Sequence, residues 1–149
     1  MGGHSLGGGL ASAAAVVTGA KGYTFNAAGL HPYTVLRAPY NILPDKMRAQ
    51  GKLIDAYHST ADPLTNIQDH SPPPVISPGA PQALGIPHPL RPAPQWQHEW
   101  GELASRHPFN AAKRMGLEGH GVNPQIVDAI EHEKDQDTAT LTKYLASAP

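Results

Sequence analysis

The run Gly3-His4-Ser5-Leu6-Gly7, continued by GGLASAAAVVTG to position 19, decides the fold that this chain is expected to adopt. Its first five residues fit the pattern G-x-S-x-G, in which a serine stands on a sharp turn between a strand and a helix. Small residues are needed around such a turn because its backbone is strained and neighbouring elements crowd against it. The small apolar residues that follow predict a helix over 10–18, which ends at Gly19.

A serine on such a turn is suited to nucleophilic attack, because the turn lifts its hydroxyl group out of the sheet. The backbone N–H of the next residue then points at the oxyanion that develops, and the start of the helix adds a favourable dipole. We therefore predict Ser5 as a nucleophile and the N–H of Leu6 as an oxyanion donor. A flexible glycine-rich N-terminus is the alternative interpretation of the same residues.

Two further segments indicate strands, which makes the predicted fold class α/β. Residues 23–28 (YTFNAA) begin with β-forming side chains and are followed by Gly29. Residues 53–59 (LIDAYHS) form the second such segment, and a short helix is predicted before it, over 45–50.

The last third of the chain is predicted to be helical. Helical turns over 100–115 are interrupted by a proline, which cannot continue a helix from the preceding turn. A further helix over 125–134 begins after Asn123-Pro124, a capping residue followed by proline at the first helical position. Asp137 is predicted to cap a separate final helix over 138–147.

Residues 70–96 form a Pro-rich segment that holds nine of the sixteen prolines and almost no charge. This segment is predicted to be a long irregular loop, laid over the surface as a cover within the domain. One hypothesis is that it covers an acyl-chain site together with Trp96, Trp100 and Phe109, although plain packing explains the same aromatic residues. Another alternative is that P-x-x-P-like stretches such as 78–81 bind aromatic-lined grooves.

The composition limits the class of protein further. A length of 149 residues suits one domain, so 1–149 is treated as a single unit. Eleven Lys and Arg against twelve Asp and Glu give a formal charge of −1, which removes the electrostatic case for non-specific binding of nucleic acid or an anionic membrane. The absence of Cys excludes a disulfide framework and a thiolate zinc site.

Targeting signals are not evident in the sequence. No apolar run reaches the roughly 18–20 residues of a membrane span, so no transmembrane segment is predicted. No Lys or Arg precedes the short apolar run over 10–17, so a signal peptide is not predicted either. The location is left open between the cytoplasm and export by a dedicated secretion system.

Over residues 3–30 the sequence closely resembles the elbow region of α/β-hydrolase lipases. The run GHSLGGGLASAAA carries the resemblance together with YTFNAAGL, in which Thr24-Phe25-Asn26 matches a motif on the strand after the elbow helix. The sequence looks most like class 3-type lipases and bacterial phospholipase effectors, with a looser resemblance over 53–68 and 115–130. The resemblance implies a serine ester hydrolase with a Ser-Asp-His triad, an acyl ester or phospholipid as substrate, and no cofactor.

The acid of the triad is chosen by its place along the chain, because the family order is Ser, then Asp or Glu, then His. Asp62 follows the strand over 53–59 and precedes Pro63, which resembles the acid turn of the family. We predict that it orients the histidine, and the alternative is a residue that only caps a turn or helix. Asp55 is the second candidate, but its place in mid-strand suits a surface role.

Nine histidines compete for the role of base. The base must follow the acid and stand on a loop from which Nε2 reaches the serine while Nδ1 faces the carboxylate. His120 meets this requirement, because a glycine on either side frees its backbone, and it resembles the family's histidine in preceding a C-terminal helix. The alternative is that His120 is an ordinary surface histidine. His107 is the second candidate, His58 comes before Asp62, and His4 is expected to pack or bond locally. The other histidines show no spacing typical of a metal site.

One departure from the family concerns the strand that leads into the nucleophile, since the first three residues are too few to supply it. The family also has earlier strands and a loop that gives a second oxyanion donor. We therefore expect a partial α/β-hydrolase fold with an elbow helix, two or so parallel strands, a Pro-rich loop and C-terminal helices. A missing N-terminal half or a partner chain would supply the rest, and the isolated chain is expected to be weakly active or inactive. The alternative is a non-catalytic remnant or an interaction module of a longer hydrolase.

Overall fold

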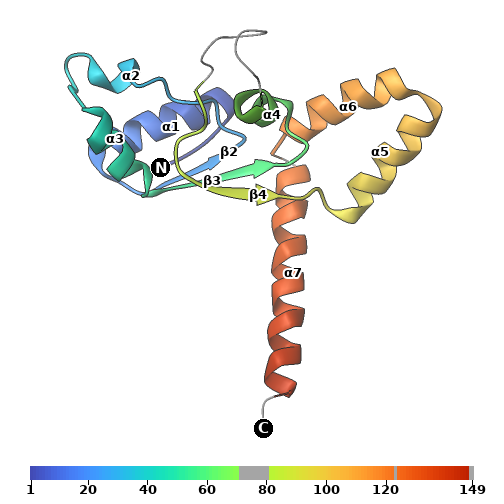
Figure 1. Ribbon diagram of the computed structural model, residues 1–149. Helices are drawn as coiled ribbons and strands as arrows, with labels where there is room; N and C mark the ends of the chain where they lie inside the picture. Colours follow the sequence, from blue (N-terminus) through green and yellow to red (C-terminus); the bar gives the residue numbers. More distant parts are fainter. Residues whose placement is uncertain (71–80, 123, 148–149) are drawn as a thin grey trace.

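The computed structural model describes residues 1–70, 81–122 and 124–147, which form a mixed α/β arrangement (Figure 1). The strands within these residues are β1 (Gly2–His4), β2 (Gly22–Phe25), β3 (Ile54–Ser59) and β4 (Ile86–Leu90). The helices are α1 (Ser5–Thr18), α2 (Tyr33–Leu36), α3 (Pro44–Gly51), α4 (Pro63–His70), α5 (Pro94–Arg106), α6 (Pro108–His120) and α7 (Gln125–Ala146). The two predicted strands and the helix after Ser5 are therefore present. α1 begins five residues before its predicted start at position 10, and β2 ends at Phe25 rather than at position 28.

The four strands form one parallel sheet in the order β1-β2-β3-β4. Parallel neighbours need a crossover connection, and helices supply it: α1 joins β1 to β2, while α2 and α3 join β2 to β3. Because the strands run in one direction, their carboxyl ends meet at the same edge of the sheet. Ser5, Asn26 and Thr60 directly follow the first three strands at this edge, where ligands bind in open parallel sheets. The fold is thus a partial α/β-hydrolase-like one, as predicted.

One face of the sheet is covered by α1 and α3. Ala15 and Val16 of α1 are fully buried and belong to the same apolar cluster as Ile54 of β3. The close approach depends on Gly22 of β2, where a Cβ would lie only 3.2 Å from the Ile54 side chain. The cluster is completed by Leu30, Val35, Ile42 and Met47. Burial of one such aliphatic side chain contributes about 1.5–3 kcal/mol, so the cluster holds α1, and with it Ser5, against the sheet.

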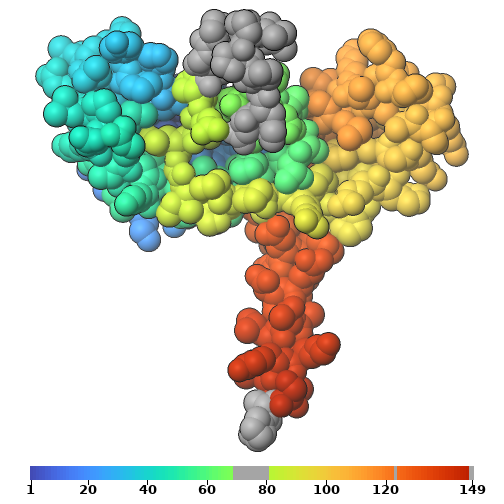
Figure 2. All heavy atoms as spheres, viewed as in Figure 1, coloured from blue at the N-terminus to red at the C-terminus, as the bar shows by residue number. Residues whose placement is uncertain are grey.

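The opposite face of the sheet is covered by the first turns of α7. Ile126 and Ala129 form an apolar cluster with Leu90 of β4, and the rings of Phe25 and Tyr57 pack against it. The outer part of α7 stands clear of the rest of the described chain (Figure 2). Its exposed apolar side chains include Leu141, Tyr144 and Leu145. Among the helices that the structure describes, none is both long and apolar enough to cross a membrane.

The Pro-rich segment differs from its prediction as one long irregular loop. Ile86–Leu90 are strand β4, and α5 begins at Pro94, so the irregular part is shorter than 70–96. The two prolines of β4 stand two positions apart, so their nitrogens face the same side of the strand. β4 is an edge strand, which has one side without a partner, and prolines are tolerated there because they have no N–H to donate. The stretch 71–80, with most of the P-x-x-P-like run at 78–81, lies outside the described residues.

The strand before Ser5 and the last helix differ from their predictions, whereas the break at Pro108 does not. Gly2–His4 pair with β2, so the residues before Ser5 do form a short strand that leads into it. α7 is continuous, so the predicted break at Asp137 is wrong. An exposed Asp inside a helix costs only about 0.7 kcal/mol relative to Ala, which the rest of the helix tolerates. The predicted interruption at Pro108 is confirmed, because α5 ends at Arg106 and α6 begins at the proline.

Candidate active site

Ser5 is the first residue of α1 and directly follows β1. Its φ of 53° lies in the left-handed region, which a residue other than glycine adopts at a cost of about 1–3 kcal/mol. The strained turn between strand and helix is therefore present. The Ala28 N–H donates to the Ser5 carbonyl oxygen at 2.9 Å, which ties the turn to the loop after β2. The N–H of Leu6 belongs to the first turn of α1, where N–H groups have no acceptor within the helix, and its role as an oxyanion donor stays a prediction.

The crowding predicted around this turn is carried by Gly3 and Gly8 rather than by Gly7. A Cβ at Gly3 would overlap the Gly7 carbonyl group, and one at Gly8 would lie 2.6 Å from the Cβ of Ala27. A Cβ at Gly7 would meet no atom of the described residues within 4 Å. The second glycine of the G-x-S-x-G pattern is therefore not required by packing in this chain, whereas Gly8, which lies outside the pattern, is.

Asp62 follows β3 and is fully buried. Its carboxylate accepts the backbone N–H groups of Leu64 at 3.2 Å and Thr65 at 3.0 Å. The Thr65 hydroxyl donates to the same carboxylate at 2.7 Å. Asp62 therefore caps α4, whose first residue is Pro63. These donors offset the cost of burying a charged group. Asp62 is therefore the capping residue that the alternative interpretation predicts, and the same carboxylate is also free to contact a histidine.

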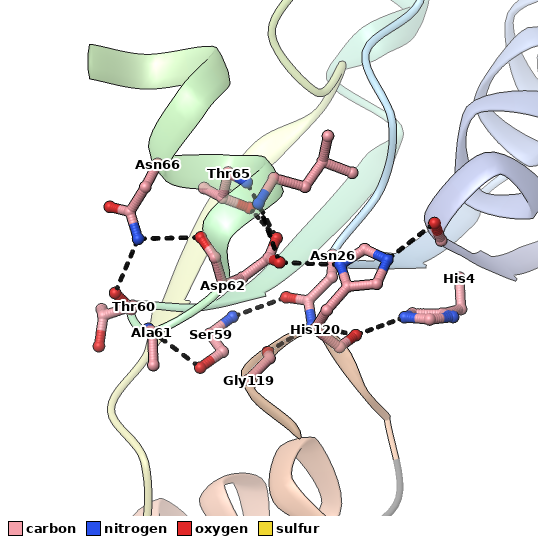
Figure 3. A network of polar contacts seen from close by, with 12 residues as sticks. His4, Asn26, Ser59, Thr60, Ala61, Asp62, Thr65, Asn66, Gly119 and His120 are labelled. Carbon is pink, nitrogen blue, oxygen red and sulfur yellow. Dashed lines mark hydrogen bonds and ion pairs between the residues drawn. The ribbon is translucent and has the colours of Figure 1, made fainter. Parts of the chain in front are cut away.

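His120 is the last residue of α6, and Figure 3 shows its ring between Asp62 and the start of α1. Its Nδ1 lies 2.8 Å from Oδ1 of Asp62, and its Nε2 lies 2.8 Å from Oγ of Ser5. The structure thus brings together the three residues that the sequence singled out. His120 stands at a helix end rather than on the predicted loop. Its side chain retains 28% of its exposure, so solvent reaches the imidazole.

The two partners of the imidazole fix the positions of its protons. A carboxylate only accepts hydrogen bonds, so Nδ1 of His120 carries a hydrogen and donates it to Asp62. In the neutral ring Nε2 is then the acceptor, and the Ser5 hydroxyl donates to it. In this arrangement an imidazole is able to take a proton from a serine hydroxyl.

Two side chains hold the main chain of His120. Nε2 of His4 donates to the His120 carbonyl oxygen at 2.6 Å, since a carbonyl only accepts. The Asn26 amide donates to the same oxygen at 2.9 Å and to the Gly119 carbonyl at 3.1 Å. His4 is expected to pack or bond locally; its hydrogen-bond partner is instead 116 positions away, while its ring packs beside that of His120 with centroids 4.9 Å apart.

Sequence reasoning assigned no individual role to Asn26 or Thr65. The signal for Thr65 is local: a hydroxyl three positions after Asp62 is able to reach the same carboxylate at the first turn of a helix. The signal for Asn26 is weaker, because an asparagine after a strand indicates only a residue that tolerates a left-handed backbone. Its distant partners have no local signature.

α5 flanks the segment around His120 through two tryptophans. Trp100 donates from Nε1 to Glu118 at 2.8 Å, and Trp96 donates from Nε1 to Asp128 at 2.8 Å. Trp100 is buried, which favours packing as its role, whereas Phe109 on α6 is 84% exposed. The hypothesis of an aromatic cover over an acyl-chain site therefore retains Phe109 as a candidate but not Trp100.

Arg114 links α6 to α5 beside these tryptophans. Its guanidinium contacts the carboxylates of Glu118 at 2.5 Å and Glu99 at 2.6 Å. The hydrogen bond and charge of Glu118, followed by those of Glu99, raise the pKa of Arg114 above its ordinary value, so the guanidinium stays charged. Solvent screens these partly exposed ion pairs and keeps their contribution to stability small. Their main consequence is to orient Glu118 toward Trp100.

The other candidates named from the sequence lie elsewhere. Asp55 on β3 contacts Nε2 of His88 at 2.8 Å. His58 lines a cavity of about 340 Å³, and His107 is exposed between α5 and α6. In the described residues no hydrogen bond joins any of these three to Ser5. Across 1–70, 81–122 and 124–147, no three acidic or histidine side chains gather as metal ligands would.

The parallel sheet and the strained serine turn at its edge define a protein with a partial α/β-hydrolase-like fold. A family model described as phospholipase-like, the Tle-like phospholipase domain, matches residues 1–86. The chain belongs to this family of Tle-like phospholipase domains. The matched residues include Ser5 and Asp62, whereas His120 lies beyond them.

The chain is also similar to an extracellular phospholipase A1 of Serratia liquefaciens, with 45% identity over 67 residues. These residues are 45% of this chain and 21% of the relative, so the chain spans about a fifth of the length of the curated relative that it matches. Together the two matches confirm the resemblance to bacterial phospholipases that residues 3–30 indicate.

Proposed function

We propose that this chain is a serine carboxylic-ester hydrolase of the lipase and phospholipase type. Ser5 is the nucleophile, His120 is the general base, and Asp62 orients the imidazole. The observation that carries the proposal is the pair of 2.8 Å contacts that His120 makes with the other two side chains. The family match and the phospholipase relative support an acyl ester, and among acyl esters a phospholipid, as the substrate.

In the first half of the reaction Oγ of Ser5 attacks the ester carbonyl carbon while Nε2 of His120 takes the hydroxyl proton. The carbonyl oxygen becomes an oxyanion, to which the N–H of Leu6 donates. Asp62 stabilises the imidazolium that forms. When the tetrahedral intermediate collapses, the bond to the alcohol oxygen breaks, and His120 returns its proton to that oxygen. The alcohol leaves, and Ser5 carries the acyl group.

In the second half of the reaction water removes the acyl group. Nε2 of His120 takes a proton from a water molecule, whose oxygen attacks the acyl carbon. The second tetrahedral intermediate collapses with cleavage of the bond to Oγ, and Ser5 regains a proton from His120. The carboxylic acid leaves, and the resting arrangement returns. Neither step needs a cofactor.

Labelling with a fluorophosphonate probe, located by peptide mass spectrometry, tests the proposal. The probe is expected to label Ser5, and the label is expected to disappear in Ser5→Ala and in His120→Ala. Ser12→Ala is the matched control, because Ser12 is a buried serine of the same helix, and this variant keeps the label. Labelling detects a slow enzyme as well as a fast one, because each molecule has to react only once. This matters here because an enzyme without the second oxyanion donor of the family loses about 10²–10³ in turnover.

The outcomes separate the proposal from its alternative. Labelling at Ser5 leads next to a comparison of phospholipids with simple acyl esters as substrates. A folded chain that does not react at Ser5 contradicts the proposal and favours the non-catalytic interaction module.

A further inference from the structure

The side chain of Asn26 lies at the end of β2 between two segments that carry the site. It is fully buried, and its φ of 43° lies in the left-handed region. Asparagine tolerates this conformation better than most residues. Its backbone N–H donates to the Tyr57 carbonyl of β3 at 2.9 Å, which holds the main chain of Asn26 against β3.

Every polar atom of the Asn26 amide group has a partner. Oδ1 accepts the backbone N–H of Ser59 at 2.8 Å, where β3 ends. Nδ2 donates to the carbonyl oxygens of Gly119 and His120, where α6 ends. The last carbonyl groups of a helix have no partner within the helix, so the amide satisfies two groups that α6 leaves open. Figure 3 shows the amide between these two segments.

The two segments that Asn26 joins carry the acid and the base. The Asn26 amide holds Ser59, and the Asp62 N–H donates to the Ser59 carbonyl at 3.0 Å. The acid is therefore linked to the amide through Ser59. The base is held more directly, because its own carbonyl is a partner of Nδ2. One planar group therefore sets the separation between the backbone of Asp62 and the backbone of His120.

We propose that Asn26 is a positioning residue that fixes His120 relative to Asp62 and Ser5, a role that rests on the proposed function. A productive arrangement must hold to within about 0.5 Å. A displacement of about 1 Å costs on the order of 10²-fold in rate. Loss of the amide releases the end of α6 from β3, and His120 then samples positions in which Nδ1 and Nε2 do not reach their partners together.

Two variants of the full chain test this role. Asn26→Asp keeps an acceptor for the Ser59 N–H but turns a second oxygen toward the two carbonyl groups of α6. Asn26→Gly accepts the left-handed backbone and removes the amide altogether. Thr24→Val is the matched control, because Thr24 is also fully buried on β2, and its hydroxyl has no hydrogen-bond partner among the described residues.

The main readout is the hydrolysis of p-nitrophenyl butyrate, with circular dichroism to show that each variant is folded. Both Asn26 variants are expected to lower kcat by about 10- to 100-fold and to leave KM nearly unchanged, because no substrate contact is removed. The low-field proton resonance of His120 Nδ1–H is expected to broaden or vanish in both. Thr24→Val is expected to match the wild type in kcat and in this resonance.

The outcomes distinguish this role from the proposed function. A wild-type chain that neither hydrolyses the ester nor reacts with the fluorophosphonate sinks the proposed function, and the role of Asn26 in catalysis with it. An active wild type with a folded Asn26→Gly of equal kcat overturns the positioning role alone. Failure of both variants to fold overturns it as well, because Asn26 then acts on stability. A folded variant with lowered kcat and a lost resonance supports it.

Discussion

His4 and His120 are 116 positions apart, and Nε2 of His4 lies 2.6 Å from the carbonyl oxygen of His120. Their rings are tilted by 46°, with centroids 4.9 Å apart. His4 ends β1 and precedes Ser5, so the contact joins the strained serine turn to the end of α6. The residue beside the proposed nucleophile thus holds the main chain of the proposed base.

Replacement of His4 by Phe is expected to destabilise the chain and slow the labelling of Ser5. The ring beside His120 is kept, but the hydrogen bond is lost, which lowers the free energy of unfolding by about 0.5–1.5 kcal/mol. Urea denaturation and the rate of fluorophosphonate labelling are the measurements. His98→Phe, at an exposed position of α5, is the control, and equal behaviour of the two variants would contradict the prediction.

Asp62→Asn is expected to lower the labelling rate of Ser5 by about 10⁴-fold. Asn keeps an acceptor for the cap of α4, but it removes the charge that holds His120 in the tautomer able to accept from Ser5. Thr65→Val is the comparison, because it removes one hydrogen bond to the same carboxylate and leaves the charge. That variant is expected to lose about 1 kcal/mol of stability and little of the rate. A rate for Asp62→Asn within about tenfold of the wild type would rule out the assigned role.

Gly8→Ala and Gly7→Ala are expected to shift the melting temperature in opposite directions. A Cβ at Gly8 lies 2.6 Å from the Cβ of Ala27, so α1 or the loop after β2 must move, at a cost of about 1–3 kcal/mol. Alanine at Gly7 meets no described atom and reduces the freedom of the unfolded chain, which stabilises by about 0.4–1 kcal/mol. Thermal unfolding of both variants is the measurement, and the reverse order would show that the turn is packed differently.

Trp100→Phe is expected to destabilise the chain more than Trp96→Phe. Trp100 is buried, and its replacement removes a hydrogen bond to the charged, half-buried Glu118, at a cost of about 1.5–3 kcal/mol. The partner of Trp96 is the half-buried Asp128, whose Oδ2 also accepts a hydrogen bond from Gln95 and so keeps a donor once the indole is gone. Denaturant unfolding compares the two variants. Similar losses would mean that α5 is not anchored mainly at Trp100.

Much of the fold follows from local patterns in the sequence. β2 and β3 are predictable from β-forming residues bounded by glycine and turn residues, and α1 from its run of small apolar residues. β4 escapes such reasoning because proline argues against a strand unless the strand lies at an edge, which only the assembled sheet reveals. The continuity of α7 through Asp137 escapes it because a residue that favours caps also survives inside an exposed helix.

Three residues of the candidate site are predictable from the sequence, because a motif or their order along the chain identifies them. Ser5 comes from its turn pattern, and Asp62 and His120 from their order after it and from the glycines around the histidine. The role of Asn26 is not predictable in this way. Its amide partners lie 33, 93 and 94 positions away, and nothing near it in the sequence indicates them.

His120 meets its two partners across separations of 58 and 115 positions. Closing loops of this length costs the chain entropy before any contact repays it, and chains with many distant contacts fold slowly. Helices need only local contacts and form within about a microsecond. On dilution from urea we therefore expect the helical signal to return before Ser5 becomes reactive toward a fluorophosphonate. Reactivity at Ser5 then reports that the chain has completed its folding, so the time at which it returns measures the last step of refolding.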